Sequence, residues 1–132
     1  MRASNKRLME DIFVEWAKGD VRPLVNAMAD DFNWIIAGSS IWSGTWRGKQ
    51  AVLRDLLKPL GDRFSDTYKN EAHRFIAEGE YVVVECRGKV TTKSGLPYHN
   101  TYCMVCRLVD GKLSELIEYM DTELAASALG SP

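Results

Sequence analysis

Four polar side chains near the end of the chain have the types and spacing that acid–base chemistry on a small molecule needs: Asn100, Tyr102, Glu118 and Asp121. The first three lie in two β-prone runs that flank an Asp-Gly pair, the dipeptide most typical of a tight hairpin turn. Because alternate side chains of a strand share one face, we expect Asn100, Tyr102 and Glu118 together on a largely apolar face. A carboxylate held there loses solvation, so its pKa rises and it can act as an acid or base near neutral pH.

Each of these residues also has a purely structural interpretation. Glu118 reaches solvent or pairs with an arginine if the strand twists near its end. Asp121 precedes Thr-Glu-Leu, a pattern typical of a helix N-cap, and capping is the more common role for an aspartate in that position. Asn100 and Tyr102 either donate hydrogen bonds to a substrate carbonyl or oxyanion, or satisfy each other and backbone groups inside the core.

Apolar residues on the predicted inner faces are candidates for the walls of a ligand pocket. Three tryptophans would suit a flat or cyclic apolar ligand, and methionines suit an adaptable wall. The alternative for all of them is ordinary core packing. The predicted wall residues are Trp16, Met28, Trp34, Ile36, Trp42, Cys86, Met104, Leu116 and Met120.

The order of the predicted elements indicates an α+β fold that spans residues 1–132 as one domain. Hydrophobic and capping patterns predict helices over 5–18, 49–60 and 122–128. They also predict a second helix that begins after a cap at Asp20. Alternation predicts strands over 32–37, 70–77 and 81–92, followed by the two arms of the hairpin. The segment 41–48, rich in glycine and aromatics, is expected to be a loop. Helices would then cover one face of a strongly bent, mostly antiparallel sheet.

Composition argues against several classes of partner. The chain has 132 residues and a formal net charge of -1, so nothing attracts it electrostatically to nucleic acid or to an anionic membrane. No apolar run is long enough to span a bilayer. The polar N-terminus lacks the core of a signal peptide, so we expect a cytoplasmic protein.

Cysteine usage and motif content predict a protein without metal or cofactor. Cys103 and Cys106 form a C-x-x-C spacing, but they lie mid-strand, where residues three apart point to opposite faces. An odd number of cysteines in a cytosolic setting indicates free thiols. The sequence also lacks a glycine-rich phosphate loop and a set of residues with zinc-ligand spacing.

Several short motifs, in this order and at these spacings, resemble the SnoaL-like branch of the NTF2-like superfamily. They are Gly19-Asp20, the run Met28-Ala29-Asp30-Asp31-Phe32-Asn33-Trp34, the run Gly44-Thr45-Trp46-Arg47-Gly48, Asp110-Gly111-Lys112-Leu113 and Glu118-Tyr119-Met120-Asp121. The resemblance covers about residues 5 to 128. It implies a cone-shaped α+β fold, with N-terminal helices enclosing a deep pocket, and a homodimer formed through the sheet face. The superfamily includes ketosteroid isomerases, limonene-epoxide hydrolases and polyketide cyclases, so the fold does not decide the activity.

The residues that carry these family activities are mostly replaced in this chain. By spacing from Gly19-Asp20, the isomerase tyrosine, base and oxyanion aspartate fall near Ile12, Ile36 and Met104. All three are apolar, which argues against classical ketosteroid isomerisation. The arginine and first aspartate of the epoxide hydrolases fall near Cys86 and Gly88. Their second aspartate falls near Glu118, where a carboxylate remains. A polyketide cyclase would use a carboxylate near the end of the last strand, a role that Glu118 or Asp121 could take.

Two hypotheses follow. The first is a cofactor-independent isomerase, cyclase or hydrolase that acts on a small hydrophobic carbonyl-like compound by carboxylate acid–base chemistry. The second is a non-catalytic module of the same fold that binds a small ligand or serves dimerisation.

Overall fold

The computed structural model describes residues 4–132. In chain order the elements are α1 (Asn5–Trp16), α2 (Arg22–Ala27), β1 (Met28–Ile36), β2 (Gly44–Arg47), α3 (Lys49–Ala51), the π-helical turn η1 (Val52–Leu57), α4 (Lys58–Gly61), β3 (Lys69–Glu78), β4 (Tyr81–Lys89), β5 (Thr101–Val109), β6 (Lys112–Met120) and α5 (Thr122–Leu129). Ser4 caps α1 by accepting a hydrogen bond from the backbone N–H of Arg7. None of the helices in residues 4–132 combines the length and the apolar character needed to cross a membrane.

A single mixed sheet forms the back of the molecule, with strand order β2-β1-β6-β5-β4-β3. The meander from β3 to β6 is antiparallel throughout, as predicted, and the Asp110-Gly111 turn joins β5 to β6. The early strand β1 pairs in parallel with β6, placing Ile36 opposite Glu118. This pairing brings the N-terminal third of the chain next to the final strand, where the candidate acid–base group lies.

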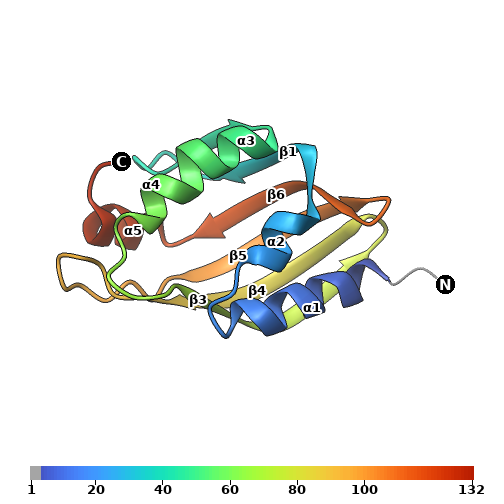
Figure 1. Ribbon diagram of the computed structural model, residues 1–132, viewed down its shortest axis with the longest axis horizontal. Coiled ribbons are helices and arrows are strands. Elements are labelled where there is room, and N and C mark those ends of the chain that lie inside the picture. Colours follow the sequence, from blue (N-terminus) through green and yellow to red (C-terminus); the bar gives the residue numbers. More distant parts are fainter. Residues whose placement is uncertain (1–3) are drawn as a thin grey trace.

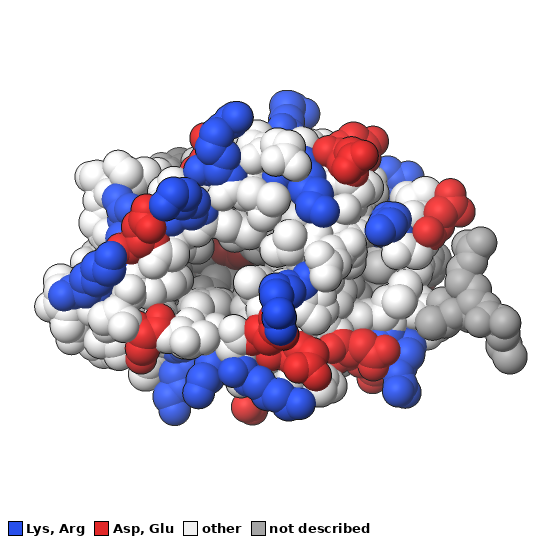
Figure 2. Space-filling view, in the orientation of Figure 1, with Lys and Arg blue, Asp and Glu red and all other residues white. Residues whose placement is uncertain are grey.

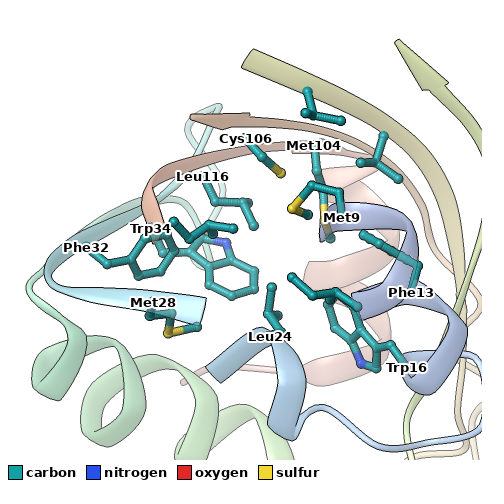
Figure 3. Close-up of a cluster of buried hydrophobic side chains, with 14 of the residues drawn as sticks. Met9, Phe13, Trp16, Leu24, Met28, Phe32, Trp34, Met104, Cys106 and Leu116 are labelled. Carbon is teal, nitrogen blue, oxygen red and sulfur yellow. The ribbon is translucent and has the colours of Figure 1, made fainter. Parts of the chain in front are cut away.

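Helices cover one side of the bent sheet (Figure 1). Helix α1 packs on β3 and β4, and the α3–η1–α4 segment lies along β1 and β2. The core fills the space between, and Figure 3 shows Met9, Phe13 and Trp16 of α1 facing Trp34 and Leu116 across it. The α+β architecture expected from the sequence, in which helices cover one face of a strongly bent sheet, is therefore confirmed.

Several local features differ from the sequence-based expectation. The strand expected over 32–37 begins earlier, at Met28. The segment 41–48 was expected to be a loop, but residues 44–47 form the short edge strand β2, which pairs with β1. Gly44 and Gly48 bound this short segment, and their presence is typical of a loop. The predicted helix 49–60 contains a π-helical turn, in which the N–H of Lys58 bonds to the carbonyl of Leu53. Pro59 follows at once; it has no N–H and its ring crowds the preceding turn, which fits a local widening. Asn100 was expected in the first arm of the hairpin, but β5 begins only at Thr101.

Candidate active site

A cavity of about 300 Å³ lies between the helices and the concave face of the sheet. Figure 2 shows the hollow in this face of the molecule, with acidic atoms visible at its bottom. Its walls come from the turn after α1, from β1, from the η1–α4 segment, from the loop before β3, and from β5 and β6. A liquid water molecule takes about 30 Å³, so the space suits a compound of one or two rings.

Glu118 lies on β6 and lines this cavity. Its neighbours across the sheet are Ile36 on β1 and Met104 on β5, both apolar. Only 6% of the glutamate surface is exposed. Burial raises the pKa of Glu118 from 4.5 to about 7, and the nearby indole N–H of Trp34 offsets part of that rise. The carboxyl group is therefore divided between its acid and base forms near neutral pH.

Trp34 places a polar atom beside this carboxylate. Its ring is buried and lines the cavity, yet its indole nitrogen makes no hydrogen bond of normal geometry within residues 4–132. Trp34 and Glu118 project from the same face of neighbouring parallel strands, because Trp34 pairs with Leu116 and Ile36 with Glu118. A buried donor without a partner is costly, so this N–H favours a negative charge on Glu118.

Three tyrosine hydroxyl groups surround the same space, from Tyr68, Tyr98 and Tyr102. Burial raises the pKa of each phenol, and the negative charge of Glu118 raises them further. All three therefore stay protonated at neutral pH and can donate hydrogen bonds. The cavity thus combines one buried carboxyl group with several neutral donors.

Asn100 is fully buried but is not part of the cavity wall. Its amide nitrogen donates to the Tyr98 hydroxyl at 3.0 Å and to the backbone carbonyl of Asp121 at 3.0 Å. Its amide oxygen accepts from the backbone N–H groups of Thr101 and Asp121. Asn100 therefore ties the start of β5 to the end of β6 and holds Tyr98.

Asp121 is exposed and lies outside the cavity wall. Its carboxylate accepts a hydrogen bond of 3.1 Å from the backbone N–H of Leu124, which makes it the N-cap of α5.

Most of the predicted wall residues meet at the cavity. Trp16, Trp34, Ile36, Trp42, Met104 and Met120 line it. Met28, Cys86 and Leu116 are buried as well, but they belong to the core and do not line the cavity. Tyr102 is also in the wall, on the same face as Glu118.

The sequence-based reasoning missed the wall opposite the sheet. Tyr68 and Phe64 come from the loop before β3, where no periodic pattern exists, and their rings stack with centroids 5.6 Å apart. Leu56, Leu57 and Leu60 enter from the η1–α4 segment. Tyr98 could have been predicted as a wall residue, because it has the same parity as Asn100 and Tyr102 in the hairpin.

Gly88 makes the position of Tyr68 possible. A Cβ atom at Gly88 would lie 2.4 Å from the Tyr68 hydroxyl oxygen and 2.8 Å from the ring carbon that bears it. We expect Gly88→Ala to push the phenol out of its place and to lower the free energy of unfolding by about 2 kcal/mol. Chemical denaturation measures this effect. The double variant Gly88→Ala/Tyr68→Ala should show coupling, with the alanine at 88 costing little once the ring is gone. Equal costs in both backgrounds would contradict the contact.

The cysteines and acidic residues do not gather into a metal site. Among residues 4–132, no group of three or more His, Cys, Asp or Glu side chains has the geometry to hold a metal ion. Cys86, Cys103 and Cys106 are free thiols, and Cys106 is buried while Cys103 is half-buried. Burial raises the pKa of Cys106 to about 12, so its thiolate is not populated near neutral pH.

The fold is shared with solved structures at low sequence identity. An NTF2-like protein of unknown function from Burkholderia pseudomallei superimposes with a TM-score of 0.81 at 18% identity, covering 98% of this chain and 100% of that one. A protein from Jannaschia, proposed to be a SnoaL-like polyketide cyclase, gives 0.75 at 18% identity, covering 100% and 99%. A proposed isomerase from Rhodopseudomonas palustris gives 0.72 at 19% identity, covering 98% and 99%.

Sequence comparison gives the family. No curated protein matches the chain significantly. The profile of the SnoaL-like domain, however, matches residues 9–116, which is most of the chain and ends just before Glu118. The chain belongs to the SnoaL-like domain family.

Proposed function

We propose that this protein is a cofactor-independent enzyme that moves a proton next to the carbonyl group of a small hydrophobic compound, in an isomerisation, a cyclisation or a related hydrolytic reaction. The observation that carries the proposal is the position of Glu118, a buried carboxyl group that faces an apolar cavity together with neutral tyrosine hydroxyls. Perturbed carboxyl groups in clefts are typical of acid–base sites.

The chemistry would use Glu118 in both protonation states. Its carboxylate removes a proton from the carbon beside the carbonyl, and the electron pair of that C–H bond forms an enolate. The carbonyl oxygen becomes negative, and Tyr102, which lines the same cavity, would donate a hydrogen bond to it. The carboxylic acid form of Glu118 then returns the proton to a different carbon, or to the product of ring closure. A group with a pKa near the working pH serves both steps.

Two relatives of the same fold support this choice of reaction class. One is proposed to be a SnoaL-like polyketide cyclase and another to be an isomerase. The alternative is a ligand-binding module without catalysis. It is favoured by the apolar residues at Ile12, Ile36 and Met104, where the resemblance would place the three functional groups of an isomerase.

The proposal is tested by following deuterium exchange beside the carbonyl in a panel of small cyclic ketones by NMR. The base form of Glu118 is required, so kcat/KM for exchange should rise about tenfold per pH unit below pH 7 and level off above it. Absence of exchange above the buffer rate for every ketone in the panel would favour the ligand-binding alternative.

The convex face of the sheet has the character of an interface between two copies of this chain, and we extend the proposal to a homodimer. Five apolar residues, one from each of five adjacent strands, pair in register and form a row across this face: Ile76, Val83, Val105, Ile117 and Ile35. Ile76 is 54% exposed, and the other four are half-buried on this face. Ion pairs border the row, Arg74 with Glu85 and Arg107 with Glu80. An apolar strip with a charged rim suits association of identical faces.

Placing a charge in the middle of this row should prevent the association. We expect Val105→Glu to convert a dimer into a monomer in sedimentation velocity, because a carboxylate would be buried without a partner at the interface. Val14→Glu is the matched control: Val14 is 54% exposed, but it lies on α1, away from the convex face. A monomeric wild-type chain, or loss of the dimer in the control alone, would contradict the proposal.

A further inference from the structure

The charges that line the cavity all have the same sign. Two ionisable carboxyl groups border it, Glu118 deep inside and Asp66 at the exposed rim. Among the described residues of the wall there is no lysine, arginine or histidine. Arg63 is not part of the wall, although its guanidinium lies 4.9 Å from the ring centroid of the wall residue Trp42. Arg63 is already engaged there, because it donates to the backbone carbonyls of Pro59 and Leu129.

Four groups whose pKa the charge of Glu118 raises are neutral at physiological pH. These groups are Tyr68 from the loop before β3, Cys86 from β4, and Tyr98 and Tyr102 next to or on β5. Burial raises the pKa of all four above its usual value, so none of them supplies a positive charge or titrates between pH 6 and 8. Of the buried described residues that line the cavity, Glu118 is therefore the one that titrates near neutral pH, and its surroundings are largely apolar.

An anionic ligand would meet two costs in this cavity. It would lose its hydration without gaining a cation in the wall, and it would be repelled by the Glu118 carboxylate at short range. An uncharged ring compound meets neither cost. It gains contact with aromatic walls, which include Trp16, Trp42 and Phe64, and hydrogen bonds from neutral hydroxyl groups.

We propose that the cavity selects uncharged, flat compounds of one or two rings and excludes their carboxylic acid analogues, with Glu118 as the group that discriminates between them. This inference deepens the proposed function, since it names the class of substrate that the same cavity admits. A carboxylate ligand enters only when Glu118 takes up a proton. Its binding is therefore coupled to proton uptake, whereas that of a neutral ligand of the same shape is not.

A matched pair of ligands tests the inference without requiring turnover. Naphthalene-2-carboxamide and naphthalene-2-carboxylate have nearly the same shape and differ in charge. In calorimetric titrations of the wild-type chain, we expect the carboxylate to bind about tenfold more weakly at pH 8 than at pH 6, because only the minor fraction of Glu118 that is protonated admits it. The carboxamide should bind with nearly the same affinity at both pH values, and more tightly than the carboxylate at pH 8.

The Glu118→Gln variant tests whether Glu118 is the group that discriminates between the two ligands. We expect it to remove the pH dependence of carboxylate binding and to narrow the gap between the two ligands at pH 8. Asp62→Asn, at an exposed residue outside the cavity wall, should leave both affinities unchanged. The inference is overturned if the carboxylate binds as tightly as the carboxamide at pH 8, if neither binds at millimolar concentration, or if the Gln variant keeps the pH dependence.

These outcomes are separate from those of the proposed function. Selective binding of the neutral ligand with no ketone exchange would refute the enzyme and keep the selectivity. Ketone exchange that depends on Glu118, together with equal binding of the two naphthalene ligands, would support the enzyme and refute the selectivity.

Discussion

Replacing Glu118 by glutamine is expected to slow proton exchange of an accepted ketone by about 10²- to 10⁴-fold, the usual contribution of a positioned acid–base group. The amide keeps the size of the side chain but cannot take up or release the proton. Substrate affinity should change far less than kcat, because the walls that hold the ring remain in place. Steady-state kinetics of the two proteins on the same ketone, at pH 8, measures the effect.

Asp121→Asn is the control for this experiment, since Asp121 is the other carboxylate that the sequence suggested. Asparagine caps a helix as well as aspartate does, so α5 should remain intact. We expect exchange within a few-fold of wild type. If the Asn variant lost activity and the Gln variant at 118 kept it, the acid–base role would belong to Asp121 and our assignment would be wrong.

The same substitution at Glu118 should change how stability depends on pH. In the folded chain the pKa of Glu118 is raised from 4.5 to about 7, so the folded state keeps a proton that the unfolded chain releases. The stability that this proton contributes is fully present below pH 4.5, is lost as the pH rises towards 7, and stays lost above it. Glutamine mimics the protonated side chain at every pH. The difference in free energy of unfolding, variant minus wild type, should therefore increase by roughly 3 kcal/mol from pH 4 to pH 8.

Urea denaturation at several pH values measures this difference, in which contributions common to both proteins cancel. Glu78→Gln, at an exposed residue near the end of β3, is the matched control and should stay within about 0.5 kcal/mol of wild type at every pH. Parallel pH curves for wild type and Glu118→Gln would mean that the carboxyl group is hydrated in solution.

Patterning predicted the middle of the sheet well because β4 and β5 obey a strict alternation. β5 buries every second residue from Tyr102 to Leu108, and on β6 the same parity from Leu116 places Glu118 inside. The parallel pairing of β1 with β6 was not predictable in the same way. It joins residues about 80 positions apart, and no local signal specifies which edge strand an early strand will meet.

The sequence predicted the sheet side of the candidate site but not the opposite side. Its sheet side follows from parity, so Trp34, Ile36, Met104 and Glu118 were found together. Its opposite side is built from a loop and from the irregular η1–α4 segment, whose side chains are directed by tertiary packing. Tyr68 is an example: its hydroxyl fits only because Gly88, 20 positions later on β4, has no side chain. Such a pairing is visible only in the folded chain.

Asn100 illustrates a different limit. Its parity placed it correctly on the inner face, but parity does not distinguish a side chain that meets a ligand from one that meets the backbone. In the fold its amide is fully used by Tyr98, Thr101 and Asp121, which leaves it no free donor for a substrate. Hydrogen-bond satisfaction, which the sequence does not encode locally, decided its role.

The most direct test of the account is the titration of the Glu118 carboxyl carbon by carbon-13 NMR, assigned by comparison with Glu118→Gln. We predict a midpoint near pH 7, as expected for an acid enclosed in an apolar cavity. A midpoint near 4.5 would show a solvated carboxylate, and it would remove the basis for both the proposed acid–base chemistry and the exclusion of anions.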